Sequence, residues 1–140
     1  MKRSAFTLVE ILIVVIILGI LAAIVIPQFT QASNDARTNA LASDLQTVRS
    51  QIQLYKVQHL DTFPPAGISA MLTSRSNQAG STGTDSNLYP LGPYLQKFPT
   101  NAYAGNNTVV NSGKGTGTAG WFYDAGTGEF CANDAAHTGM

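Results

Sequence analysis

The sequence predicts an α+β protein in which one long N-terminal helix carries a small antiparallel β-sheet head on its C-terminal half. The first observation is an apolar run from residue 6 to residue 26. The second is an apolar stripe at helical spacing, made of Leu41, Leu45, Val48, Ile52 and Tyr55. The third is a pair of aromatic segments, 121–124 and 129–132, that flank a Gly-containing loop and indicate a β-hairpin.

The apolar run has the ~20 residues that a helix needs to cross ~30 Å of hydrocarbon. Two basic residues precede it, a small residue, Ala5, stands directly before Phe6, and a lone carboxylate, Glu10, lies in its first turns. A carboxylate at bilayer depth is expensive, so we expect a partner charge for it. A secretory signal peptide is the first alternative, but the run is long for one and contains Glu10. A plain signal anchor is the second, and it leaves Ala5, Phe6 and Glu10 unexplained.

The stretch Ala-Phe-Thr-Leu-Val-Glu that begins at Ala5 resembles the processing motif of type IV pilin-like proteins. The resemblance implies that a prepilin peptidase cleaves between Ala5 and Phe6, and that the new amino terminus on Phe6 is methylated. It also implies that Glu10 pairs with the Phe6 amino group of a neighbouring subunit. Gly19 and Pro27 fall where the family has the residues that loosen this helix on assembly. The family usually has Gly where this chain has Ala5.

We expect the chain to be organised in four segments. These are a leader peptide at 1–5, a hydrophobic transmembrane and assembly helix at 6–27, an amphipathic helix at 28–62, and a small globular β head at 63–140. No Gly or Pro interrupts residues 28–60, so both helical segments should form one helix of about 50 residues, or ~80 Å. A head of this size cannot bury so long a helix. Its first half must therefore be covered by lipid or by other copies of the chain.

Within the head, the sequence predicts a short helix in residues 68–75, a strand around Val109 and Val110, and the hairpin described above. The connection 113–120 is rich in Gly and is expected to be flexible. We expect the polar tail, 133–140, to be mobile.

Enzyme activity is not predicted. His59 and His137 are isolated in the sequence, and Cys131 within an aromatic strand is typical of a small buried apolar residue. The sequence at 113–116 departs from a phosphate-binding loop because Gly follows its Lys. Without the leader the chain has six basic and eight acidic residues, so no nucleic-acid partner is expected. A role in DNA uptake would need a basic aromatic patch, which the sequence lacks.

The one cofactor considered is calcium. A single cysteine forbids an internal disulfide. Asp124, Asn133 and Asp134 cluster in sequence around the final hairpin, and such oxygen donors suit hard cations. Ordinary turn chemistry explains the same residue types. The resemblance adds weight to a metal site, because the major pseudopilins of type II secretion lack disulfides and hold this region with calcium.

A second stretch narrows the resemblance to those major pseudopilins. Residues 98–105 are similar to their loop Leu-Pro-x-Asp-Pro-(Trp/Tyr)-Gly. Pro99 and Tyr103 fit this pattern, whereas Asn101 replaces the Asp and Ala102 the second Pro, and Ala104 is an extra residue before the Gly.

The resemblance implies a structural subunit that polymerises into the helical pseudopilus of a type II secretion system and so drives export of folded proteins. A type IV pilin of an adhesion or motility pilus is the alternative. A membrane-anchored enzyme or binding domain would need a convergent polar site, which the sequence does not reveal. The expected partners are further copies in a filament, the inner membrane, the prepilin peptidase, and secretion or pilus assembly machinery. The expected location is the bacterial inner membrane before assembly, and a periplasmic or cell-surface filament afterwards.

Overall fold

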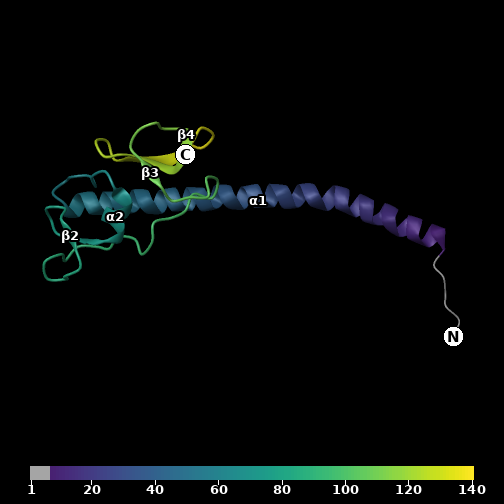
Figure 1. Ribbon diagram of the computed structural model, residues 1–140, viewed down its shortest axis with the longest axis horizontal. Helices are drawn as coiled ribbons and strands as arrows, with labels where there is room; N and C mark the ends of the chain where they lie inside the picture. Colours follow the sequence, from purple (N-terminus) through teal and green to yellow (C-terminus); the bar gives the residue numbers. More distant parts are fainter. Residues whose placement is uncertain (1–6) are drawn as a thin grey trace. The chain divides into compact units, whose positions relative to one another are not determined.

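The computed structural model describes residues 7–140 (Figure 1). The chain divides into two compact units, Met1–Ala36 and Arg37–Met140, which we call the N-terminal unit and the C-terminal unit. Helix α1 (Leu8–Gln58) is 51 residues long and contributes to both units. The prediction of a single helix of this length is therefore confirmed. The predicted leader, residues 1–5, lies outside the described residues.

The N-terminal unit exposes its apolar side chains on all sides of α1. Every large hydrophobic residue from Leu8 to Phe29 is exposed. Among the described residues, α1 is the one helix long and apolar enough to cross a membrane. Pro27 lies inside the helix, and one turn later the Thr30 hydroxyl donates to the carbonyl of Ile26 at 3.2 Å.

The C-terminal unit builds two small sheets and a short helix against the end of α1. Helix α2 (Ile68–Thr73) is followed by β1 (Arg75–Ser76) and β2 (Thr82–Gly83), which pair antiparallel. Strands β3 (Val109–Val110), β4 (Thr116–Asp124) and β5 (Glu129–Asp134) form the second sheet in the order β3-β4-β5.

The second sheet differs from the predicted antiparallel sheet in one pair. β4 and β5 are antiparallel, as the hairpin prediction required, but β3 runs parallel to β4. Val109 pairs with Trp121 in the second half of β4, so the connection 111–115 and the first half of β4 together bring the chain back alongside β3. The sheet is therefore mixed, and the α+β fold class is confirmed.

The Gly-rich connection that was predicted to be flexible belongs in part to β4. This strand begins at Thr116, which pairs with Asp134, and its register with β5 shifts before Trp121 pairs with Ala132. Gly120 lies in the shifted stretch, where an added Cβ would come within 2.3 Å of the Asn106 carbonyl oxygen. Glycine is thus required by the close approach of two backbones.

The core of the C-terminal unit forms between the predicted stripe of α1 and the hairpin. All five stripe residues are buried, and they share one hydrophobic cluster with Trp121, Tyr123 and Phe130. Trp121 Nε1 donates to the carbonyl of Pro99 at 3.0 Å, and the Tyr123 hydroxyl donates to that of Pro64 at 2.7 Å. The predicted packing of the sheet on the C-terminal half of α1 is confirmed, and Figure 1 shows the sheet alongside this part of the helix.

Helix α1 ends at Gln58, four residues before the predicted end of the amphipathic helix at residue 62. Leu60 and Asp61 both have positive φ, at 54° and 62°, and the Asp61 amide donates back to the carbonyl of Lys56 at 3.0 Å. This left-handed turn satisfies a carbonyl of the last helical turn and directs the chain away from the helix axis.

Candidate functional site

The start of α1 forms a capping box around Glu10. Thr7 precedes the helix, and both its backbone amide and its hydroxyl donate to Glu10 Oε2 at 2.8 Å. The Glu10 amide lies 3.3 Å from the Thr7 hydroxyl. This Thr-x-x-Glu arrangement satisfies two amides that the first helical turn leaves without intrahelical partners. The pairing of Glu10 with Thr7 was not predicted from the sequence, although their Thr-x-x-Glu spacing is typical of a capping box.

The capping box leaves one carboxylate oxygen available. Both bonds from Thr7 go to Oε2, and no bond to Oε1 is found within the described part of the chain. Thr7 therefore fixes the orientation of Glu10, and Oε1 is the oxygen that remains to accept from a cation. Ala5 and Phe6, the predicted cleavage site, and Phe6 as the predicted methylation site, lie outside the described residues.

Gly19 and Pro27 are the other predicted assembly residues, and both lie within the helical stretch of the N-terminal unit. A Cβ added at Gly19 would meet nothing within 4 Å, so its small size is not required by the packing of its own chain. Pro27 has no backbone N–H and cannot complete the helical hydrogen bond at its position.

The three predicted calcium ligands do not come together. Asp124 ends β4 and pairs with Glu129 at the turn of the hairpin, whereas Asp134 ends β5 and pairs with Thr116 at its other end. Five residues of strand, roughly 16 Å at ~3.3 Å per residue, separate these two positions. No cluster of three or more His, Cys, Asp or Glu that fits a metal ion occurs among residues 7–140.

Several oxygens of these residues also accept hydrogen bonds within the protein. Asp124 accepts from the Gly126 amide at 2.8 Å and from the Thr127 hydroxyl at 3.0 Å, and these bonds lower the pKa of its carboxyl. Asn133 is completely buried, and its Oδ1 accepts from the Gly115 amide at 2.9 Å. The residues proposed from the sequence therefore do not fit a calcium site. Their hydrogen bonds are those of turns and strand ends.

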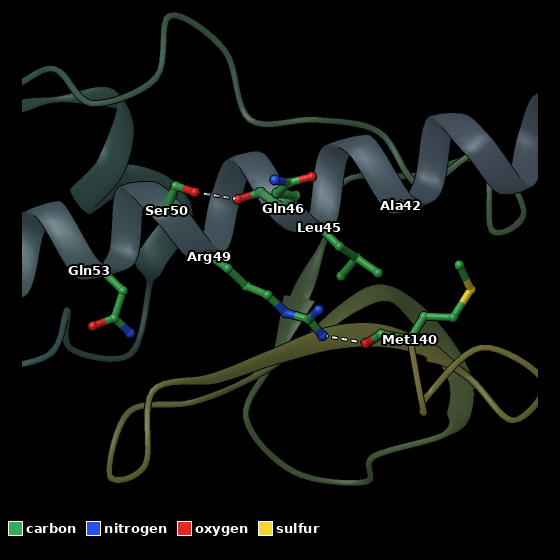
Figure 2. Close-up of a pocket in the computed structure, with 7 residues that line it drawn as sticks. All are labelled: Ala42, Leu45, Gln46, Arg49, Ser50, Gln53 and Met140. Atoms are coloured by element: carbon green, nitrogen blue, oxygen red, sulfur yellow. Dashed lines mark hydrogen bonds between the residues drawn. The ribbon is translucent and has the colours of Figure 1, made fainter.

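The tail predicted to be mobile is instead held to the C-terminal unit. Asn133 and Asp134 belong to β5, and Asp134 Oδ1 accepts from His137 Nδ1 at 2.5 Å. Arg49 on α1 donates through Nε to the Phe130 carbonyl at 2.9 Å and through Nη2 to the Met140 carbonyl. Figure 2 shows this arginine reaching from the helix to Met140. The sequence signal for these contacts is weak, because they join residues far apart in the chain.

Arg49 also lines a groove of the C-terminal unit. The groove has a volume of about 540 Å³ and runs along α1 beside Gln46, Arg49, Gln53 and Met140 (Figure 2). These residues do not form a catalytic constellation. The groove is bounded on one side by the helix and on the other by the tail.

His59 and Cys131, the residue types most often used in catalysis, are both buried and packed within the C-terminal unit. His59 is buried and stacks on Tyr55 at 3.6 Å, with Nδ1 donating to the Tyr55 carbonyl and Nε2 bonded to Ser76 Oγ. Cys131 is buried in β5, and burial raises the pKa of its thiol, so the reactive thiolate is disfavoured.

The loop 98–105 is held by Asn101, one of the residues that depart from the pseudopilin pattern. Asn101 is completely buried, and its Nδ2 donates to the Gly120 carbonyl at 2.7 Å. Its Oδ1 accepts from the amides of Tyr103 and Ala104 at 2.8 and 3.1 Å. An amide serves both roles here, whereas an ionised Asp could only accept.

Comparison with known proteins finds one family model at the N-terminus and relatives that align with most of the chain. Residues 1–26 match the family model for the prokaryotic N-terminal methylation motif. The chain is 28% identical to a type II secretion system core protein G of Klebsiella michiganensis, over 81% of this chain and 77% of that protein. The protein of the same name from Vibrio cholerae is 27% identical over 82% and 76%. That from Pseudomonas aeruginosa is 40% identical over 44% and 42%. No solved structure matches the chain. The predicted resemblance to pilin-like proteins and to a type II secretion major pseudopilin is confirmed.

Proposed function

We propose that this pilin-like chain is a structural subunit that polymerises into the helical pseudopilus of a type II secretion system and thereby drives export of folded proteins. The observation that carries the proposal is the difference in burial of apolar side chains between the two units. The C-terminal unit completes its own core, while the apolar side chains of the N-terminal unit remain exposed from Leu8 to Phe29. So large an apolar surface requires lipid or other subunits around it. The similarity to core protein G over most of the chain favours the secretion filament over an adhesion or motility pilus.

The proposed cycle begins in the inner membrane. The basic residues of the leader stay on the cytoplasmic side, in line with the positive-inside rule, and the segment 6–27 crosses the bilayer. A prepilin peptidase then removes residues 1–5 by cleaving between Ala5 and Phe6, and Phe6 is methylated. The match to the N-terminal methylation motif supports both steps. Assembly moves the subunit from the membrane into a periplasmic filament.

We assign Glu10 the role of registering each subunit on its neighbour. Its Oε2 is held by Thr7, and this contact fixes the direction in which Oε1 points. The cation that Oε1 would accept is the Phe6 amino group of the adjacent subunit. A matched pair of charges removes the penalty that each would bear alone in an apolar filament core.

Gly19 and Pro27 would allow α1 to change shape during assembly. Gly19 has no packing role within its own chain, and Pro27 removes one helical hydrogen bond. The segment between them is thus the weakest part of the apolar helix. We propose that it loosens when subunits pack.

A non-catalytic role agrees with the surroundings of the candidate nucleophile and base. Cys131 is buried with a raised thiol pKa, and both ring nitrogens of His59 are engaged. The activity assigned here therefore resides in polymerisation.

The proposal is tested by complementation. The chain is expressed in its own bacterium after deletion of its gene, and an exoprotein of the secretion system is measured inside and outside the cell. We expect the deletion to trap the exoprotein in the periplasm and the restored gene to release it. Unchanged export in the deletion strain, together with loss of surface pili or motility, would contradict the secretion role and favour a type IV pilin.

A further inference from the structure

We infer that the C-terminal unit is closed by a clasp of protein groups and needs no cation. The clasp consists of Thr38 and Arg49 on α1, Tyr103 in the loop 98–105, and Asp134, His137 and Met140 at the end of β5 and beyond. It joins the tail to the helix at two points. The inference does not rest on the proposed function, because every contact lies within one C-terminal unit.

Arg49 forms the first point. Its guanidinium presents several donors in one plane, and two of them are used on different parts of the chain. Nε bonds the Phe130 carbonyl within β5, and Nη2 bonds the Met140 carbonyl beyond it. One rigid side chain on α1 thereby holds both the strand and the tail. Such a contact closes a loop of the chain about 90 residues long, which local sequence preferences cannot do.

The second point is a relay from the tail to α1. Asp134 Oδ1 accepts from the ring Nδ1 of His137 at 2.5 Å and from its backbone amide at 3.1 Å. The His137 ring stacks on Tyr103, with 4.1 Å between ring centroids. The Tyr103 hydroxyl is bonded to Thr38 Oγ1 at 2.7 Å. Each member is thus fixed by the next, from the end of β5 to the helix.

The donor groups at this end of the hairpin do not make a cation cage. A hard cation such as calcium takes six to eight oxygens. Asn133 Oδ1 accepts from Gly115, and Asp134 Oδ1 accepts from His137. Asp134 Oδ2 is buried without a partner, and it is the one side-chain atom of this kind in residues 7–140. One unpartnered side-chain oxygen is far short of a coordination shell, and Asp124 lies at the other end of the hairpin.

The test uses the full chain in detergent micelles. Trp121 is the single tryptophan and is completely buried in the core of the C-terminal unit, so its fluorescence reports the unfolding of that unit alone. Melting is compared in millimolar calcium and in a calcium chelator. We expect the same Tm in both. A site filled to 100 times its Kd would raise the Tm by on the order of 10 °C, and a rise of that size would overturn the inference.

The clasp itself is tested with matched variants. Arg49→Gln should lower the Tm by about 5–10 °C, because the part-buried Phe130 carbonyl and the exposed Met140 carbonyl both lose a charged donor. Arg37→Gln makes the same change at an exposed position of α1 and should leave the Tm unchanged. His137→Phe keeps a ring against Tyr103 but removes the bond from the ring nitrogen to Asp134, and it should also lower the Tm. Equal melting of Arg49→Gln and Arg37→Gln would refute the role of Arg49.

Hydrogen exchange of the unaltered chain covers the case in which a variant does not fold. The backbone amides of residues 134–140 should exchange more slowly than those of the exposed loop 84–88. Exchange at the same rate in both segments would show that the tail is not clasped, whatever the variants do.

Discussion

Replacement of Ile52 by Ala tests whether the stripe of α1 carries the C-terminal unit. Ile52 is completely buried in the cluster that contains Trp121 and Phe130. The change removes three carbons, worth about 2.4 kcal/mol at ~0.8 kcal/mol each. The cavity left between helix and sheet adds to this, and comparable substitutions cost about 2–5 kcal/mol. We therefore expect a loss of about 3 kcal/mol in the free energy of unfolding.

The assay is thermal unfolding of the full chain in detergent, followed by Trp121 fluorescence. A loss of about 3 kcal/mol corresponds to a decrease of more than about 10 °C in Tm for a unit of this size. Val57→Ala is the control, because Val57 lies on the same helix but is 79% exposed. It should change the Tm by less than about 2 °C, as surface substitutions usually do. If the two variants melt alike, the stripe does not support the sheet and the account of the core is wrong.

Three further predictions concern processing, assembly and pH. Intact-mass spectrometry of the membrane form should find a chain that begins at Phe6 and carries one methyl group; an intact Ala5–Phe6 bond in cells with active prepilin peptidase would contradict the processing step. Glu10→Leu should insert into the membrane at least as well as the parent chain but yield no filaments. Thr7→Val keeps the charge of Glu10 and should reduce the filament yield only partly. If Glu10→Leu loses insertion and assembly equally, Glu10 does not pair with the neighbouring amino group. The hydrogen bonds to Asp124 lower its carboxyl pKa, so their contribution to stability is complete above the ordinary value of about 3.9 and is lost as the pH falls through the lowered pKa. Asp124→Asn should flatten this part of the curve of Tm against pH. An unchanged curve would show that the hydrogen bonds to the Asp124 carboxylate do not stabilise the turn.

The helix and the hairpin could be predicted because their signals are local and periodic. Apolar residues at steps of three and four marked the buried face of α1, and the structure buries all five of them. The aromatic arms on either side of a Gly-containing loop marked β4 and β5. Both patterns act over fewer than 20 residues. They therefore predict the local structure without knowledge of the contacts made by the rest of the fold.

The parallel β3 and the true extent of β4 depend on contacts that no short pattern contains. Val109 and Val110 read only as a strand, and their direction is set by the return path to Trp121. The Gly-rich start of β4 was taken for a flexible loop because glycine usually weakens strands. At Gly120 glycine is needed instead, since Asn106 passes too close for any side chain.

The fold separates the predicted calcium ligands for a similar reason. Asp124, Asn133 and Asp134 are near one another in sequence, but an antiparallel hairpin places its turn and its open end apart. The groups that do meet at the open end come from three distant segments. Arg49, Tyr103 and His137 could be identified there only once the chain was folded. The capping box at Glu10, by contrast, was available from the Thr-x-x-Glu spacing alone.

The most direct test of the central claim is a helical reconstruction of filaments assembled from this chain by electron cryo-microscopy. We expect the apolar segment 6–27 of every subunit to lie in the filament core. We also expect Glu10 to lie within ion-pair distance, about 4 Å, of the Phe6 amino group of a neighbouring subunit. A reconstruction in which this segment faces solvent, or in which Glu10 contacts only Thr7 of its own chain, would contradict it.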